Sequence, residues 1–166
     1  SVSAPNTATA PNPFNGTLLI RIDGGLVDPG VPALDFRAGS SNSVVKGLVI
    51  NNLANGDAIR IVGSLGHTIS GNYIGTNPAG TAKVANCVGL NAHTELGAGM
   101  GKNVQVGGTL PADRNILSGN SGCAAATASY PGTGWVFEGN YIGLAANGLA
   151  AIGNSNIGDS GGLSID

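Results

Sequence analysis

Charged and aromatic residues are scarce in this chain. Of its 166 residues, 10% are charged and 4% are aromatic, and the formal net charge is -2. Low hydropathy with high net charge is typical of disorder, so a chain with so few charges is expected to fold. It has no Lys/Arg cluster, and binding to nucleic acid or to an anionic membrane is therefore not predicted. Its apolar runs are all shorter than the roughly 18 residues of a membrane-spanning helix.

Glycine and asparagine are abundant instead, with 29 Gly and 18 Asn residues. Each glycine inside a helix costs about 1 kcal/mol relative to alanine, so long helices are not expected. The apolar residues are mainly Val, Ile, Leu and Ala in short runs, separated by Gly, Asn and Pro. Such runs predict short strands joined by turns. Few charges, polar turns and a chain that starts at Ser1 favour a secreted, extracellular or cell-surface protein.

The sequence also repeats itself. The segment SGNYIG at 70–75 returns as EGNYIG at 138–143, and related runs are LSGN at 117–120 and INNL at 50–53. Strand-like segments and no helical unit lie between these copies, which indicates a β-solenoid. We predict an all-β, right-handed, single-stranded parallel β-helix of about four to five coils over residues 17–166. Residues 1–16 are rich in Pro and small polar residues, and they predict an extended N-terminal arm.

Three segments resemble a known repeat. Residues 69–76, 107–120 (GGTLPADRNILSGN) and 137–143 are similar to repeats of the right-handed parallel β-helix family of bacterial secreted and cell-surface proteins, and residues 44–51 look like an earlier coil of the same kind. The resemblance covers about residues 40–158 and is carried mainly by the long 107–120 motif. It implies the β-helix fold and an extracellular location, and it implies no particular activity.

The Gly-Asn pairs are predicted to form the corners of the coils. Asn side chains at equivalent corners can stack and bond along the solenoid, and both Gly and Asn tolerate the left-handed backbone of a sharp corner. Asn52 and Asn72 are 20 residues apart, as are Asn120 and Asn140. The predicted corner residues are therefore Asn52, Gly71, Asn72, Gly119, Asn120, Gly139 and Asn140.

Cys87 and Cys123 each follow a turn and open a strand-like run, 36 residues apart. If they occupy equivalent places on neighbouring coils, they lie about 5 Å apart, within the range of a disulfide. A secreted protein with two cysteines fits such a bridge. Two buried, inward-pointing thiols are the alternative that the sequence leaves open.

No enzyme is predicted. Nucleophilic, acid–base and metal chemistry need clustered groups, and the acids of this chain are scattered. The string GDSGG at 158–162 matches a serine-protease nucleophile motif, but a turn at a coil corner explains it better, because the chain has only two histidines and none in a matching context. The sequence thus predicts no catalytic residue, cofactor or metal ligand, although stacking could still bring distant acids together for a polysaccharide lyase or hydrolase.

Two tyrosines and the chain ends suggest possible partners. Tyr73 and Tyr141 occupy equivalent repeat positions, so they could stack against glycans in an adhesin, or they could cover a small core. The ends of a β-solenoid expose unpaired strand edges, and the sequence shows no capping helix. We therefore expect head-to-tail self-assembly into a filament or matrix, with the arm reaching onto the next copy. The expected assembly residues are Pro5, Pro11, Pro13, Phe14, Leu163 and Ile165.

Overall fold

The computed structural model describes residues 3–92, 101–122, 125–128, 134–154 and 162–165. They form 14 strands in three parallel sheets. Sheet I contains β1 (Ile20–Asp23), β4 (Leu48–Asn51), β7 (Tyr73–Ile74), β10 (Ile116–Leu117) and β13 (Tyr141–Ile142). Sheet II contains β2 (Leu34–Phe36), β5 (Asp57–Ile61), β8 (Val88–Ala92), β11 (Ala126–Ala128) and β14 (Leu163–Ile165). Sheet III contains β3 (Val44–Lys46), β6 (Thr68–Ser70), β9 (Gln105–Gly107) and β12 (Val136–Glu138).

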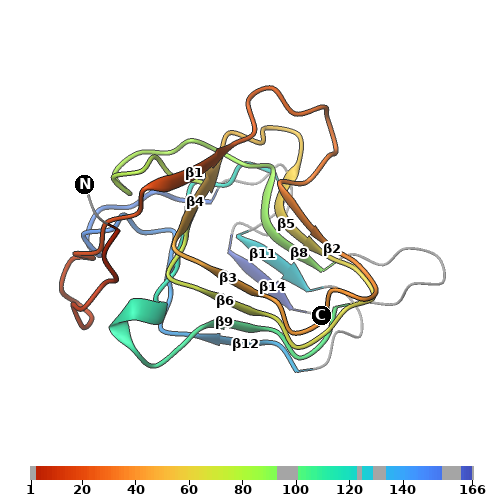
Figure 1. Ribbon diagram of the computed structural model, residues 1–166. Helices are drawn as coiled ribbons and strands as arrows, with labels where there is room; N and C mark the ends of the chain where they lie inside the picture. Colours follow the sequence, from red (N-terminus) through yellow and green to blue (C-terminus); the bar gives the residue numbers. More distant parts are fainter. Residues whose placement is uncertain (1–2, 93–100, 123–124, 129–133, 155–161, 166) are drawn as a thin grey trace.

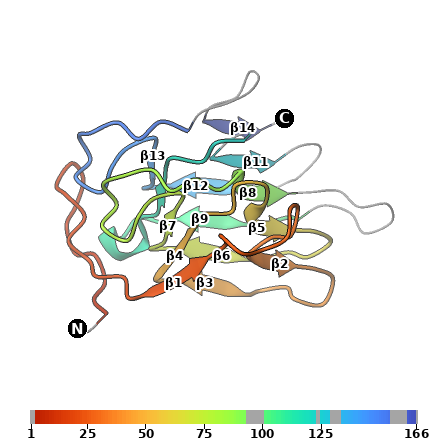
Figure 2. The same ribbon diagram turned by 90° about the horizontal axis from the view of Figure 1, so that it is seen from above.

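Successive strands always pass to the next sheet, so the chain winds as a solenoid. Each strand pairs in parallel with the strand three places along the chain, as β1 pairs with β4 and β5 with β8. Fourteen strands make four complete turns and two strands of a fifth. Figure 1 looks along the three-sided coil, and Figure 2 shows the turns stacked from β1 to β14. The predicted all-β solenoid is confirmed, and the one helix of the described residues is the short 3-10 turn η1 (Pro111–Asp113).

The interior is a set of apolar columns, because register places one inward side chain of each strand above its equivalent. In sheet I the column pairs Ile22 with Ile50, Ile50 with Ile74 and Ile74 with Leu117. Sheets II and III add the columns Leu34, Ile59, Leu90, Ala126 and Val45, Ile69, Val106, Phe137. All three columns meet in one core. Full burial of each aliphatic side chain contributes roughly 1.5–3 kcal/mol, so the core holds the short strands in place.

The coils differ in length. The step from one coil to the next in sheet I is 24 residues from Val49 to Tyr73, 43 from Tyr73 to Ile116 and 25 from Ile116 to Tyr141. Two similar excursions follow β7 and β13, closed by the antiparallel bridges Thr76–Lys83 and Leu144–Ala151. The excursions stack on each other, since Ala146 N–H donates to the Gly80 carbonyl. Inserted loops thus lengthen a coil without disturbing its rungs.

The N-terminal arm does not extend away from the molecule, contrary to the expectation from its composition. Figure 2 shows this segment rising beside the coils and returning to β1. Asn6 is buried and its Nδ2 donates to the Pro111 carbonyl, while Phe14 N–H donates to the Ala146 carbonyl. The arm therefore covers the outside of sheet I of its own chain.

Candidate functional site

One corner of the solenoid carries a ladder of asparagines. The side chain of Asn115 donates to Asn140 Oδ1 (2.9 Å) and accepts from the backbone and side chain of Asn72 (2.9 and 3.1 Å). Each amide also donates across the corner to a carbonyl, as Asn115 does to Ile69 (2.8 Å). At the lower end of the ladder, Asn72 Oδ1 accepts from Leu48 N–H. These amides, of which Asn72 and Asn115 are fully buried, replace strand pairing where sheet III passes into sheet I.

A second ladder follows the corner between sheets I and II. Asn86 Nδ2 donates to Asn120 Oδ1 (3.1 Å), and Asn120 donates in turn to Asn154 Oδ1 from both its backbone and its side chain. Asn86 and Asn120 are buried, and their amides also reach the carbonyls of Ile50 and Ile74. Asn72 and Asn140 therefore belong to one corner and Asn120 to another, although the sequence grouped them together.

Within each Gly-Asn pair, the glycine takes the left-handed backbone conformation. Gly71, Gly119 and Gly139 have φ of +66°, +78° and +67°. Asn52 is the exception among the predicted corner asparagines, with φ of +67°. It joins neither ladder, because its Nδ2 donates to Asp23 Oδ1 (2.8 Å) at the start of the solenoid. That bond, the Gly25 N–H and the charge of Arg21 lower the pKa of Asp23.

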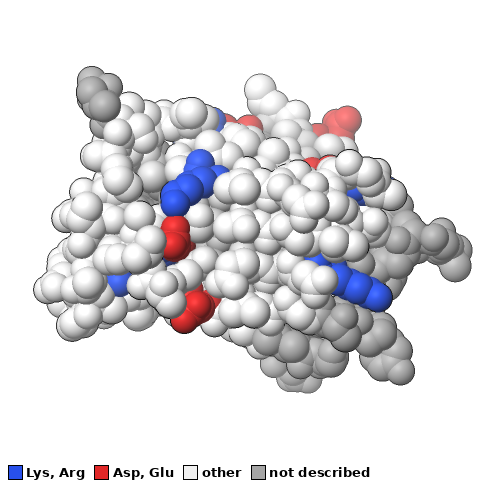
Figure 3. All heavy atoms as spheres, turned by 60° about the horizontal axis from the view of Figure 1, so that its bottom comes forward, with Lys and Arg blue, Asp and Glu red and all other residues white. Residues whose placement is uncertain are grey.

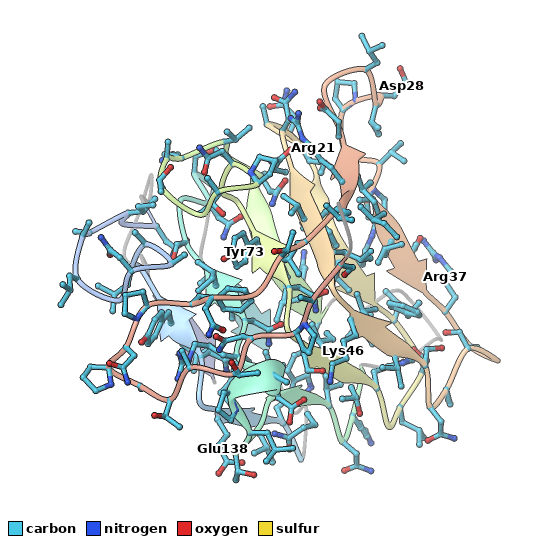
Figure 4. The ribbon with its side chains drawn as sticks, turned by 60° about the vertical axis from the view of Figure 1, so that its left-hand side comes forward. Arg21, Asp28, Arg37, Lys46, Tyr73 and Glu138 are labelled. Carbon is cyan, nitrogen blue, oxygen red and sulfur yellow. The ribbon has the colours of Figure 1, made fainter. Side chains whose placement is uncertain are left out.

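Tyr73 and Tyr141 share one column on the outside of sheet I, separated by Ile116. They are 3% and 8% exposed, because the arm covers them. The Phe14 ring meets Tyr73 edge-on at 5.0 Å, and Tyr141 Oη donates to the Asn12 carbonyl. Figure 4 shows the arm passing across this face. Of the two roles that the sequence left open for these tyrosines, the structure favours the cover of a small core, since both rings belong to a second, outer cluster of buried residues.

Stacking also gathers charges that are distant in sequence. On the outside of sheet II, Arg60 Nε lies 3.8 Å from carboxylate oxygens of both Asp35 and Asp57. Arg37 bonds Asp35 (2.9 Å), and Asn91 donates to Asp57 (3.1 Å). Since these carboxylates face cations and an amide, the cluster ties three coils together and does not present the two unpaired acids of glycoside hydrolysis. Elsewhere charge is sparse, as Figure 3 shows for one face.

Of the two cysteines, the structure describes Cys87. Cys87 is half-buried just before β8, and its N–H donates to the carbonyls of Leu53 and Gly56. Cys123 lies outside the described residues, as does most of the GDSGG string. In the register of β8 and β11, Leu90 lies opposite Ala126, the same offset of 36 residues that separates the cysteines. The disulfide stays a prediction, which alkylation of the unreduced, denatured protein would test.

The two rims of the solenoid are the remaining candidate site. The lower rim is formed by β1, β2 and β3 and the upper rim by β12, β13 and β14, each the last strand of its sheet. Core residues that are only partly buried are confined to the coils next to these rims: Ile22, Ala33, Leu34, Phe36 and Leu48 below, and Trp135, Phe137 and Ile142 above. Most exposed large apolar residues lie there too: Leu19, Ile20, Leu26, Val27, Val31 and Val44 below, and Val136, Leu149 and Leu163 above.

Of the expected assembly residues, only some lie at a rim. Leu163 is exposed in β14, and Ile165 ends the same strand. Pro5, Pro11 and Pro13 are exposed on the arm, and Phe14 is half-buried. Because the arm packs beside its own sheet I, these four residues are not placed at an end of the solenoid, which corrects the sequence interpretation.

Within the described ranges, no three His, Cys, Asp or Glu side chains gather as a metal site would require. The same residues form no helix long and apolar enough to cross a membrane. Comparison with known proteins found no matching family model, no similar curated protein and no similar solved structure. The resemblance to bacterial β-helix repeats therefore stays a prediction.

Proposed function

We propose that this protein is a non-enzymatic structural subunit, acting outside the cell, whose two rims stack head-to-tail. The half-exposed core residues at both rims carry the proposal. Inside the solenoid the same columns are fully buried, with Ile50, Ile59 and Ile74 at 0% exposure. An added layer of strands would bury Ile22 and Leu34 in the same way, and would pair edge groups that otherwise face water.

The rims are stepped, and this limits how two copies fit. Sheets I and II have five strands each, while sheet III has four. If β1 of one copy pairs with β13 of another, β2 follows onto β14, because each strand climbs a third of a turn. β3 then lies two rungs above β12, about 9.6 Å away, and one strand position in sheet III stays open. In this setting each sheet continues the sheet of the same kind in the next copy, and repeating the contact gives an open polymer.

The apolar columns continue across this contact. Ile22 of the added copy comes above Ile142, and Leu34 comes above Leu163, by extension of the observed registers. Like residues therefore meet on the inward side of both paired sheets. An extracellular location is supported by the low charge and by the polar Gly/Asn corners. The faces of the Tyr73 and Tyr141 rings do not offer a sugar-stacking strip, because the arm covers them.

Sedimentation velocity over a range of concentrations, with negative-stain electron microscopy, tests the proposal. The wild-type protein should form larger species as its concentration rises. Ile20→Lys places a charge on the lower rim, where Ile20 is 63% exposed, and should shift the protein toward monomer. Leu110→Lys is the matched control, because Leu110 is also 63% exposed but lies on the side of the solenoid. A wild-type protein that stays monomeric to about 100 μM would contradict the proposal.

A further inference from the structure

Arg114 is a buried cation without an acidic partner. It follows the turn η1, and its side chain is only 4% exposed. Its Nη1 donates to the Ala8 carbonyl (3.1 Å), and its guanidinium carbon lies 4.5 Å from the centre of the Tyr141 ring. Its Nε is buried without a hydrogen-bond partner. None of the acids that the structure describes pairs with this guanidinium.

This arrangement is unusual, because desolvating a charge costs several kcal/mol unless a counter-charge or several hydrogen bonds offset it. One carbonyl and one aromatic ring offset only part of that cost. The neighbouring acid does not help, since Asp113 is paired with Lys46 on the other side of the turn (2.9 Å). A positive potential therefore persists beside Arg114 in a chain whose net charge is -2.

A cavity of about 430 Å³ opens onto this residue. Its walls come from the arm, from the loop before η1 and from the corner that precedes β13, including Thr109, Pro111, Arg114 and Glu138. The volume is in the range of small-molecule sites. Arg114 supplies a positive group at one wall, and Glu138 supplies an exposed carboxylate at another.

We propose that this cavity binds a sugar acid, with the carboxylate of a uronic acid at Arg114 and its hydroxyls near Glu138. A guanidinium binds a carboxylate through two parallel hydrogen bonds, which a neutral sugar cannot match. The Glu138 carboxylate accepts hydrogen bonds from hydroxyls and repels a second anionic group. The cavity therefore selects a ligand with one anionic end and one hydroxyl-rich end. This site is independent of the rims.

Titration with potassium D-galacturonate, followed by the amide resonances of Asn140 and Tyr141, tests the site. D-galactose is the matched neutral probe, and potassium chloride keeps the ionic strength constant. We expect galacturonate to shift these resonances with a Kd on the order of 1 mM, and galactose to leave them unchanged. A stronger response to an oligogalacturonate would identify an acidic polysaccharide as the source of the ligand, and an equal response would identify the free acid.

Three variants separate this site from non-specific attraction. Arg114→Lys keeps the positive charge but loses the guanidinium that donates two parallel hydrogen bonds to a carboxylate. It should weaken galacturonate binding at least about tenfold. Glu138→Gln alters an exposed residue, so the fold should persist, and it should weaken galacturonate binding because a neutral amide accepts hydrogen bonds from the sugar hydroxyls less strongly than a carboxylate does. Lys102→Gln removes an exposed cation far from the cavity and should change nothing. Equal shifts with galactose, absence of binding, or unaltered affinity in Glu138→Gln would overturn the proposal.

Discussion

Replacing Asn115 by alanine should destabilise the protein far more than its small size suggests. Its fully buried side chain makes four hydrogen bonds, to Asn140, to Ile69 and twice to Asn72. Alanine leaves the buried Asn72 N–H without its acceptor, at about 1–3 kcal/mol, and removes the bond to Ile69, at about 0.5–1.5 kcal/mol. We expect the free energy of unfolding to fall by about 2–4 kcal/mol, or the Tm by about 4–16 °C.

Urea unfolding followed by the fluorescence of Trp135, the single tryptophan, measures this change. The control is Asn55→Ala, since Asn55 is exposed and should change the free energy of unfolding by less than about 0.5 kcal/mol. Asn115→Asp separates the effect of lost hydrogen bonds from the effect of lost packing contacts. Aspartate fills the same space, but its carboxylate faces Ile69 O and Asn140 Oδ1 without a proton to donate. The ladder account is refuted if Asn115→Asp is as stable as wild type at pH 7, or if Asn115→Ala loses no more than the control.

Three further perturbations test other parts of the structure. Gly71→Ala should lower the stability in thermal unfolding more than Gly47→Ala does. Both glycines have positive φ, but a Cβ on Gly71 would lie 2.7 Å from the Ala112 carbonyl oxygen, while a Cβ on Gly47 would meet open space. Equal losses of stability would argue against this contact. Burial lowers the pKa of His67, so the unfolded chain takes up its proton first and the free energy of unfolding should fall as the pH drops below about 6.5. His67→Gln should flatten this dependence between pH 7.5 and 5.5, and an unchanged slope would assign it to another group. Burial raises the pKa of Tyr73, so stability should decline as the pH rises above about 10. Phe14→Ala should uncover this ring and lower its pKa in a phenolate absorbance titration, and an unmoved titration would show that the arm does not shield it.

The fold class followed from the sequence because repeated corners are local features. A glycine at a left-handed corner and an asparagine beside it are visible as Gly71-Asn72 and Gly139-Asn140, without knowledge of the rest of the chain. Short apolar runs between corners then indicated strands. Together these features indicate a solenoid, because stacked repeats bury such short runs against the neighbouring coils.

The assignment of corners to rungs could not be derived from spacing. Inserted loops change the coil from 24 to 43 residues, so equal spacing in sequence does not mean equal position in the coil. Asn86, Asn115 and Asn154 were missed for this reason. Asn115 did carry a signal, because it precedes two apolar strand residues just as Asn72 and Asn140 do.

The position of the arm and the Arg114 cavity depend on contacts between distant residues. Asn6 meets Pro111 and Phe14 meets Tyr73, and nothing in either local sequence encodes that partner. Composition alone made the arm look extended, since it lacks the alternation of a strand. The buried Asn6, the Phe14 ring and the carbonyls of Ala8 and Asn12 together hold it against the outer column of sheet I.

The central claim is that successive coils stack in register, and paired cysteines test it most directly. Thr68 and Gln105 lie opposite each other on adjacent strands of sheet III, and Val44 lies one rung further along the same column. With Cys87 and Cys123 replaced by serine, Thr68→Cys with Gln105→Cys should oxidise to a disulfide, because adjacent rungs are about 4.8 Å apart. Val44→Cys with Gln105→Cys should stay reduced across about 9.6 Å. Equal cross-linking of both pairs, or of the second pair alone, would contradict the stacked coil.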